Sequence, residues 1–282
     1  MRLANLGCGN RFHPDWINID IAPNDPRVIA HDLSAGVPLE SASCDVVYHS
    51  HVLEHLRGGD AVSFMRECLR VLMPGGILRV ATPDLERIAR LYLGSLEKAV
   101  AGDSGDYDWI ILEMYDQTVR EESGGQMREY LRRNPLPAEA FVLARIGQEG
   151  REIVQVLRRH PDTPAAAAPP LEARLADALR HPIRAIRQKM LQPLLGSHDR
   201  RALRIGRFRL AGEVHQWMYD RYSLAKLMTE VGFENPLPQT ATSSLIAGWS
   251  AFNLDTQSDG TVIKPDSMYM EAIRPLAGGE AV

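Results

Sequence analysis

The sequence predicts an α/β protein with a Rossmann-like, mostly parallel twisted sheet, and three observations lead to this prediction. Short apolar runs alternate with turn residues along the first third of the chain, some of these runs are apolar almost throughout, and segments with helical spacing follow. Nearly continuous apolar strands are typical of parallel sheets whose two faces are both covered.

The first four expected strands precede the first long helix. They are the runs RLANLG, WINIDI, RVIAHDL and CDVVYHS, all within residues 2–50. A helix is predicted within residues 59–76 because apolar side chains recur there at helical spacing. Asp60 is its expected N-cap, and the Pro-Gly-Gly run at residues 74–76 is its expected stop.

The later elements continue this pattern. The run ILRVATP, residues 77–83, predicts a fifth strand, and residues 84–100 have the spacing of an amphipathic helix. Towards the C-terminus, residues 219–233 predict a helix that ends at Gly232. The run SMYMEAI, residues 267–273, predicts a last strand.

A long and irregular middle region implies one sheet domain with an insertion after the fifth strand. The Pro/Ala-rich segment near residues 161–170 predicts a flexible connector. We expect the sheet domain in residues 1–97 and 215–275, a mostly helical insertion that caps the substrate in residues 98–214, and a frayed tail in residues 276–282.

Composition limits the function classes. The net charge of −4 gives no global reason to expect nucleic-acid binding. The three cysteines lack the short paired spacing of a zinc ribbon or a redox motif, so we expect reduced thiols and a cytoplasmic location. Neither a signal peptide nor a run long enough to span a bilayer is recognisable in the sequence.

A glycine-containing loop follows the first strand. Gly7 and Gly9 would let the backbone approach a ligand at the carboxyl end of a parallel sheet. In a dinucleotide site the third glycine would stand at position 12, which is Phe12, and only residues 10–15 separate Gly9 from the next strand. That is too short for the crossover helix that holds a pyrophosphate, so the loop favours a nucleoside ligand without phosphates.

Acidic residues end the next two expected strands. Asp20 is placed to accept two hydrogen bonds from a ribose diol. Asp32 is placed to accept from an adenine amino group, with Leu33 packed on the ring. Each acid alone also fits a turn residue at a strand end, and it is their succession after the glycine loop that favours the nucleoside.

Taken in order, the motifs NLGCGN, NID, HDL, CDVVYHSHVLEHL and RVLMPGGILRVATPD resemble those of class I S-adenosylmethionine (SAM)-dependent methyltransferases. The likeness is strongest over residues 1–97, returns at HQWMYDRYSLAKLMTEVGFENP, and extends to SGGQM and KPDSMYMEA. The type 11-like branch associated with bacterial surface-polysaccharide and glycan modification is the most similar. The resemblance implies the class I methyltransferase fold and SAM as cofactor.

Two departures from the family pattern stand out. Asn5 occupies a position that is often acidic, and the chain begins at its first strand, so a segment of the insertion is expected to cover the cofactor. The residues expected to contact SAM are Asn5, Gly7, Cys8, Gly9, Asp20, Ile21, Asp32, Leu33, His49, Ser50 and His51.

The run HVLEHL, which begins at His51, also spells the H-x-x-E-H motif of one zinc-peptidase class. That motif needs a helix and a further ligand, whereas here it stands between a strand and Arg57-Gly58-Gly59, so we expect no metal. We expect residues 49–51 to line the methyl-transfer cleft, while Glu54 and His55 order the loop. The alternative is that both histidines are capping or solvent residues.

The chemistry requires positioning of the acceptor and, for a hydroxyl group, a general base. His215 is the preferred base because it directly precedes the closing helix, with His51 and Asp116 as the other candidates. Each histidine also fits a structural role. The expected substrate contacts are Gln117 and Arg120 from a polar wall, and Trp217 and Tyr219 as stacking surfaces or core residues.

The proposed reaction is O-methylation of a sugar or glycan hydroxyl. The alternatives are a small metabolite or quinone-like ring as acceptor, and a catalytically silent SAM-binding partner subunit. The acceptor, a small molecule or a glycan, is the expected partner. The basic stretch of residues 180–209 fits weak contact with an anionic membrane surface, or a solvated face. The oligomeric state is left open.

Overall fold

The structure is a computed structural model that describes residues 1–160 and 195–276. The Pro/Ala-rich segment at residues 161–170 lies outside the described residues, as do residues 180–194 of the basic stretch and residues 277–282 of the tail. No helix among the described residues combines the length and the apolar character needed to cross a membrane.

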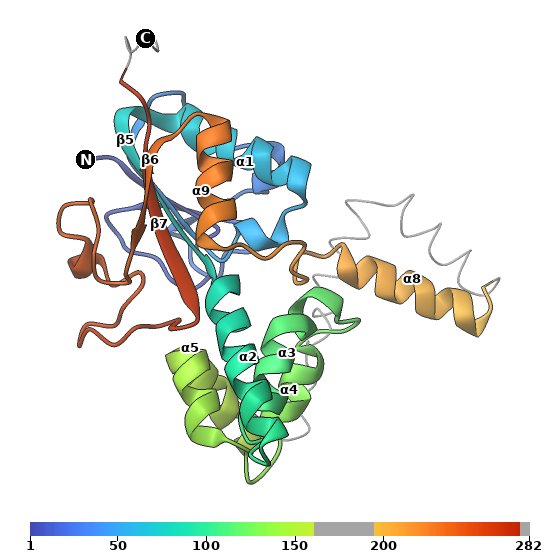
Figure 1. Cartoon of the computed structure of the whole chain (residues 1–282). Coiled ribbons are helices and arrows are strands. Elements are labelled where there is room, and N and C mark those ends of the chain that lie inside the picture. The colour runs from blue at the N-terminus through green and yellow to red at the C-terminus, as the bar shows by residue number, and fades with distance from the viewer. Residues whose placement is uncertain (161–194, 277–282) are drawn as a thin grey trace.

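A seven-stranded sheet forms the centre of the molecule, in the order β3-β2-β1-β4-β5-β7-β6 (Figure 1). β1 to β5 run parallel, and β7 pairs antiparallel with both β5 and β6. The predicted Rossmann-like, mostly parallel fold is therefore confirmed. The strands are β1 (Leu3–Leu6), β2 (Ile17–Asp20), β3 (Val28–Ala30), β4 (Cys44–Ser50), β5 (Leu72–Pro83), β6 (Glu234–Gln239) and β7 (Ser267–Ile273).

The sequence did not predict β6, which contains Pro236 and Pro238. Proline lacks the N–H that a central strand must donate, so such a run argues against a strand anywhere except at an edge. β6 is an edge strand, paired only with β7, and the missing donors therefore cost it little.

Helices α1 (Gly58–Val71) and α9 (Arg221–Val231) pack together on one face of the sheet (Figure 1). Alternation along β4 sends Val47 to this face, while Val46 and Tyr48 face the other side. The segment that follows β6 covers that other side, with Trp249 buried against β4.

Two details at the ends of α1 differ from the prediction. Arg57 is the N-cap, and Asp60 lies within the first turn. The helix ends at Val71, before the Pro-Gly-Gly run, because the chain enters the sheet at Leu72, which pairs with Cys44. At the other end of the chain, Gly232 ends α9 in the left-handed conformation as predicted.

The region after β5 is helical in its described part, and its boundaries as a separate domain remain a prediction. A small core around Trp109, Tyr130 and Val142 holds α3 to α5 together, whereas α8 buries no side chain and projects from the molecule (Figure 1). The helices are α2 (Leu85–Val100), α3 (Tyr107–Val119), α4 (Gly125–Leu131), α5 (Glu139–Arg159, kinked at Gly147) and α8 (Ser197–Arg209).

Candidate functional site

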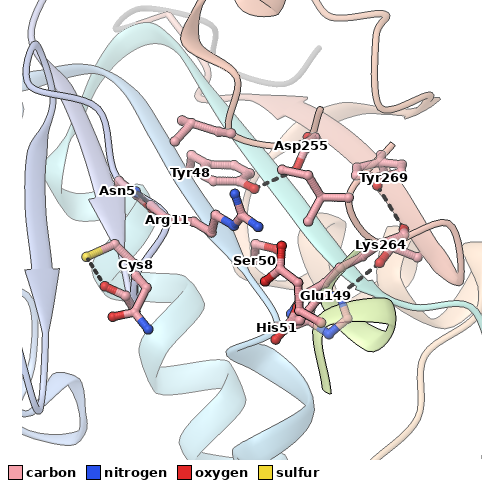
Figure 2. Close-up of a pocket in the computed structure, with 17 residues that line it drawn as sticks. Asn5, Cys8, Arg11, Tyr48, Ser50, His51, Glu149, Asp255, Lys264 and Tyr269 are labelled. Carbon is pink, nitrogen blue, oxygen red and sulfur yellow. Dashed lines mark hydrogen bonds and ion pairs between the residues drawn. The ribbon is translucent and has the colours of Figure 1, made fainter. Parts of the chain in front are cut away.

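A cavity of about 500 Å³ opens at the carboxyl ends of β1 and β4 (Figure 2). The sheet forms its floor, the segment after β6 forms one wall, and α5 contributes acidic side chains to its rim. We call it the first cavity. Its lining residues are Asn5, Gly7, Cys8, Gly9, Asn10, Arg11, Tyr48, Ser50, His51, Glu149, Glu152, Leu254, Asp255, Ile263, Lys264, Ser267 and Tyr269.

The loop after β1 brings backbone rather than side chains to this cavity. Gly7 has a φ of +66°, and a Cβ there would lie 2.4 Å from Cγ2 of Val52. The amides of Gly7 and Cys8 both donate to the carbonyl of Ile19, which ties the loop to β2. Only glycine fits position 7, because any side chain there is both strained and overlapping.

Asp20 at the end of β2 orders the same loop. Its Oδ2 accepts from the amide of Gly9 at 2.8 Å, and its Oδ1 accepts from the amide of Ala22 at 2.9 Å. Each carboxylate oxygen has two lone pairs, so both can still accept from a ligand hydroxyl. Asp20 does not line the first cavity itself.

Burial of the Cys8 thiol, reinforced by the charge of Asp20, raises the pKa of Cys8 to about 11.

Asn5 explains one departure from the family pattern. Its Nδ2 donates to the carbonyl of Arg11 at 2.9 Å and to Oδ1 of Asn18 at 3.2 Å. A carboxylate could not donate either bond. The amide therefore holds the loop in place, and Figure 2 shows the side chain of Arg11 pointing from this loop into the cavity, towards Tyr48 and Ser50.

The remaining predicted contacts at the ends of β2 and β3 lie away from the first cavity. Asp32 caps the short 3₁₀ helix Leu33–Ala35 by accepting from the amide of Ser34 at 2.9 Å, and the side chain and amide of Ser34 together lower the pKa of its carboxyl. Leu33 packs against the main core, and Ile21 is 68% exposed. None of these three side chains lines the cavity.

The end of β4 divides its two predicted contacts between the faces of the sheet. Ser50 lines the first cavity, whereas His49 is fully buried on the opposite face, with its ring centroid 5.1 Å from that of Phe64 in α1. Burial lowers the pKa of His49 to about 4, so this histidine is neutral at physiological pH. The alternation of side chains along a strand explains the division.

A buried ion-pair network fixes the wall of the first cavity. Arg79 is fully buried on β5 and donates to Asp255 at 2.8 and 3.0 Å and to Glu271 at 2.7 Å. Its guanidinium lies 4.2 Å from the ring centre of Trp249. The hydroxyl of Tyr48 donates to Asp255 at 2.5 Å, and burial raises the pKa of Tyr48 well above its usual range.

A second cavity of about 300 Å³ adjoins the first, and α3, α4 and α5 supply most of its walls. His51, Glu149 and Lys264 line both cavities, and the last two form an ion pair of 3.5 Å between them. The second cavity is lined by His51, Pro83, Trp109, Gln117, Arg120, Gly124, Met127, Arg128, Leu131, Ile146, Glu149, Gly150, Ile153, Lys264 and Asp266.

The predicted polar wall is part of this second cavity. Arg120 pairs with Asp116 at 2.6 Å and with Glu213 at 3.1 Å. Asp116 also accepts from the amide of Gln126 at 2.6 Å, and Glu213 from the amide of Gly124 at 2.9 Å. Asp116 is thus buried and occupied in holding the wall together, which leaves it poorly placed to act as a base.

His51 stands where the two cavities meet. Its Nε2 lies 2.8 Å from Oγ of Ser267, and its Nδ1 lies 3.0 Å from Oε1 of Glu54. Its φ of +55° is uncommon for a residue other than glycine, and such strain is concentrated at functional sites. The chain therefore holds this imidazole in one orientation from both sides.

Glu54 is fully buried beneath His51. Burial alone would raise the pKa of its carboxyl, but the contact with His51 and the neighbouring His55 and His215 outweigh it and lower the pKa to about 2. Glu54 is therefore ionised at physiological pH. An ionised carboxylate at Nδ1 fixes the tautomer of an imidazole and stabilises its protonated form.

His215, the preferred base in the sequence analysis, lines neither cavity. It is 6% exposed and packs against His55, with the ring centroids 4.9 Å apart, and burial lowers its pKa to about 3. The geometry therefore moves the candidate base to His51. Trp217 is 59% exposed, and Tyr219 is buried in the main core, so neither reaches a cavity, whereas Gln117 and Arg120 do.

The part of the chain around the first cavity is similar to a known protein family. Residues 6–80, which hold the glycine loop, β2, β4 and the His51 loop, match a family described as a methyltransferase domain. Over these residues the chain is similar to a methyltransferase domain. This family binds SAM, in agreement with the resemblance on which the sequence prediction rested.

Curated proteins similar to this chain match it over short segments. A protein of Mycolicibacterium smegmatis named "Probable S-adenosylmethionine-dependent methyltransferase" is 50% identical over 60 residues, which are 21% of this chain and 23% of that protein. A protein with the same description from Mycobacterium tuberculosis is 36% identical over 99 residues, or 29% of this chain and 35% of that protein. The chain thus spans only about a quarter to a third of the length of these relatives.

Solved structures add little to this assignment. A SAM-dependent methyltransferase from Thermotoga maritima covers 97% of this chain and 82% of its own, at 10% identity and a TM-score of 0.37. Another from Mesorhizobium loti covers 30% of this chain and 47% of its own, at 18% identity and a TM-score of 0.23. Scores this low carry no argument, so the fold assignment of this chain rests on the strand order of its sheet.

Several residues at the two cavities were not predicted from the sequence. Tyr48 falls inside the motif CDVVYHSHVLEHL and Arg11 directly follows the motif NLGCGN, but neither residue carries a separate signal of its own. Lys264 lies within a segment that resembles the family, whereas Glu149 and Trp109 come from the region after β5, where no local pattern marks them.

Proposed function

We propose that the protein is a SAM-dependent methyltransferase that binds SAM in the first cavity and the methyl acceptor in the second. The observation that carries this proposal is that the two cavities meet at His51, Glu149 and Lys264. A transfer reaction needs donor and acceptor sites that join at one point, where the reacting atoms can be aligned.

The lining of the first cavity suits this cofactor. The backbone of the glycine loop leaves room for a nucleoside, and the exposed guanidinium of Arg11 is available for the carboxylate of the methionine moiety. Glu149 and Glu152 on α5 bring negative charge to a site for a ligand with a sulfonium and an ammonium group. Asp20 lies just outside this lining and supports it through the Gly9 amide, and a ribose that extends past the glycine loop would donate to its remaining lone pairs.

We assign the base role to His51. An acceptor oxygen from the second cavity would attack the methyl carbon, forming a C–O bond as the C–S bond breaks and S-adenosylhomocysteine leaves. The acceptor proton would pass to Nε2 of His51, which now faces Ser267, and Glu54 would stabilise the imidazolium through Nδ1. The sulfonium is already activated, so the protein mainly aligns the groups and removes one proton.

A sugar or glycan hydroxyl remains our proposed acceptor. The second cavity combines the polar Gln117, Arg120 and Asp266 with the ring of Trp109, a mixture that suits hydroxyl groups on a ring. Its volume of about 300 Å³ is at the lower end for ligand sites, so it fits one ring of a larger acceptor. A role in polysaccharide biosynthesis is part of the same proposal.

The apolar part of the second cavity supports an alternative acceptor. Met127, Leu131, Ile146 and Ile153 line it together, and such a surface suits a small metabolite or a quinone-like ring. A silent SAM-binding partner subunit is the remaining alternative, and the presence of two adjoining cavities with an oriented histidine between them weighs against it.

Two further expectations remain proposals. Cys8, Cys44 and Cys68 are free thiols, which supports a cytoplasmic location. The exposed arginines of α8 support weak contact with an anionic membrane surface. Sedimentation with vesicles that contain or lack anionic lipid tests this contact, and equal sedimentation with both would exclude it.

Calorimetric titration with SAM and with S-adenosylhomocysteine tests the cofactor site. We expect both to bind the wild-type chain, and we expect Asp20→Ala to weaken binding because it frees the Gly9 amide and removes the ribose acceptor. Asp15→Ala, with a side chain 76% exposed, is the matched control that leaves binding unchanged. Absence of SAM binding in the wild-type chain would refute the proposed function.

Release of S-adenosylhomocysteine with a panel of acceptors then separates the two acceptor classes. The panel pairs mono- and oligosaccharides with catechols and quinols of similar size. Turnover on the sugars supports the primary proposal, and turnover confined to the aromatic rings supports the alternative. Binding of SAM without turnover on either class would favour the silent subunit.

A further inference from the structure

Three metal-ligand side chains converge beneath the His51 loop, outside both cavities. One ligand atom each from Glu54, His55 and His215 lies within 4.8 Å of the other two. Residues 1–160 and 195–276 contain no other such group of three. Glu54 and His55 come from the short 3₁₀ helix Leu53–His55, and His215 comes from the segment that precedes α9.

The polar atoms of this cluster are buried without adequate partners. The Nδ1 atoms of His55 and His215 are buried and, within the described chain, form no hydrogen bond. The carboxylate of Glu54 contacts Nδ1 of His51 at 3.0 Å and accepts from Oγ1 of Thr82 at 3.3 Å, which leaves lone pairs on both of its oxygens. A buried polar group without a partner is destabilising, so two unpaired imidazole nitrogens beside a buried carboxylate indicate that something binds between them.

We propose that Glu54, His55 and His215 bind one Zn²⁺ ion, with a water molecule as fourth ligand. Two imidazole nitrogens and one carboxylate oxygen are a ligand set that zinc accepts, and a divalent cation offsets the buried charge of Glu54. Tetrahedral bonds of about 2.0–2.1 Å place ligand atoms about 3.4 Å apart, so closure requires only a modest contraction of the cluster.

The surroundings of the cluster support this assignment. The backbone of Val214 forms a hydrogen bond with His55, and Glu54 contacts His51, so two of the ligands are oriented by outer contacts. Bound metals in proteins usually have such outer contacts on their ligands. The two imidazole rings meet edge to face, at 81° and with their centroids 4.9 Å apart.

The site fits a structural metal rather than a catalytic one. None of its three ligands lines either cavity, so neither SAM nor an acceptor would reach the ion. The carbonyl of Glu54 already accepts from the amide of Gln216 at 2.7 Å, and the amide of His215 donates to the carbonyl of Gln117 at 3.0 Å. The ion would therefore join the loop that carries His51 to the segment that packs on α3, and would fix the Glu54–His51 pair.

This arrangement differs from the zinc peptidase that the H-x-x-E-H spelling suggested. In that class the two histidines of the motif bind the ion within a helix. Here His51 faces the cavities, while Glu54 and His55 turn the other way and are completed by His215. The proposed site could not be recognised from the motif because its third ligand lies 160 positions away from His55 in the chain.

Zinc binding by the full, untagged chain tests the proposal directly. After treatment with a chelator, the wild-type chain is titrated with Zn²⁺ against a chromophoric competitor, and one ion per chain should bind with micromolar affinity or better. We expect His55→Ala and His215→Ala each to weaken binding at least 100-fold, and His198→Ala, with a side chain 95% exposed, to leave it unchanged. Absence of a stoichiometric ion in the wild type, or equal binding by folded alanine variants, overturns the proposal.

A second variant gives a signal that does not depend on a loss. In His215→Cys loaded with Co²⁺, a sulfur ligand would produce a thiolate-to-cobalt charge-transfer band in the near-ultraviolet that the wild type lacks. His49→Cys is the matched control, because His49 is equally buried but outside the cluster. A band in both or in neither overturns the assignment. These measurements use neither SAM nor an acceptor, so their outcome is distinct from that of the proposed function.

Discussion

The two cavities that meet at His51 are lined by different parts of the chain. The first cavity uses the backbone of the glycine loop and the buried side chains of β4 and β5, held by a network centred on Arg79. The second cavity uses side chains of α3, α4 and α5, held by two ion pairs of Arg120, one with the buried Asp116 and one with the partly exposed Glu213. The shape of the first cavity is thus determined by the sheet, and the shape of the second cavity by the helices that follow β5.

The difference indicates which part of the site is general and which is particular to this chain. A cavity of backbone and buried network tolerates few substitutions, because each one leaves a strained residue or an unpaired charge. A cavity of helix side chains can change its lining while the sheet remains intact. We therefore expect changes in the first cavity to affect SAM binding and stability, and changes in the second to affect the acceptor.

The largest effect is expected at His51, one of the three residues that line both cavities. His51→Asn removes the proposed base but tolerates the left-handed backbone at position 51. We expect kcat to fall about 10²–10⁴-fold, which is the usual contribution of a general base. Binding of SAM should change little, because the glycine loop is unaffected.

Steady-state release of S-adenosylhomocysteine, together with calorimetric titration of SAM, gives both quantities. His198→Asn, which alters an exposed histidine far from the cavities, is the control. Full turnover in His51→Asn would mean that His51 only shapes the junction and that the proton leaves by another route.

The next effect separates the two networks. Arg79→Met leaves Asp255 and Glu271 buried without their partner, and we expect the free energy of unfolding to fall by about 3–5 kcal/mol. Arg120→Met should cost less, because one of its partners, Glu213, is 37% exposed and can turn to water, while the buried Asp116 keeps the amide of Gln126 as a donor. Urea denaturation measures both changes.

Arg90→Met provides a baseline for these two variants. Arg90 forms an exposed pair with Glu86 one helical turn away, and the loss of such a pair costs about 0.5 kcal/mol or less. If Arg79→Met were no more destabilising than Arg90→Met, the network would not be what holds the wall of the first cavity.

The contrast between the sheet and the helices that follow β5 also explains which features the sequence could predict. The strands β1 to β5 and the glycine loop are local patterns, since alternation, strand-end acids and Gly7 can all be read within a few residues. β6 was missed because its prolines argue against a strand unless its edge position is known. The insertion was expected to cover the cofactor, and Glu149 of α5 does line the first cavity, but no local pattern singled this residue out.

The sequence predicted which residues lie near the cleft better than it predicted which way their side chains point. His49 and Ser50 were both placed at the cleft, yet adjacent residues of a strand face opposite sides, and register alone decides which one. His215 was placed near the reacting groups and does approach Glu54, but its segment packs so that the ring turns away from the cavities. That packing depends on contacts between distant segments.

A smaller effect compares glycines in the two walls. Gly7→Ala adds a Cβ 2.4 Å from Val52 at a positive φ, and Gly125→Ala adds one 2.5 Å from Asp116, also at a positive φ. We expect each to lose about 1–3 kcal/mol of stability from strain and overlap. Gly7→Ala should also weaken SAM binding, whereas Gly125→Ala should raise KM for the acceptor alone.

Thermal unfolding, SAM titration and acceptor kinetics on these two variants test whether the first cavity binds SAM and the second cavity binds the acceptor. Gly58→Ala, at a position with ordinary φ and open space, is the control for the substitution itself. If Gly125→Ala weakened SAM binding as much as Gly7→Ala, the two cavities would not be independent sites.

The smallest effect concerns a thiol in the first cavity. Because the pKa of Cys8 is raised from 9.0 to about 11, its thiolate fraction at pH 8 is about 100-fold below that of an ordinary cysteine. Alkylation of Cys8 by iodoacetamide should therefore be slow at pH 8 and rise about tenfold per pH unit up to about pH 11. Mass spectrometry of the labelled peptide follows the rate.

The same labelling reports on the cofactor, because Cys8 lines the first cavity whereas Cys68 is fully buried in the main core. We expect SAM to protect Cys8 at every pH, and Cys68 to stay unlabelled while the chain is folded. Labelling of Cys8 that is unaffected by saturating SAM would place the ligand away from the glycine loop. The first cavity would then not be the cofactor site, and the comparison between a cofactor site made of backbone and an acceptor site made of side chains would no longer hold.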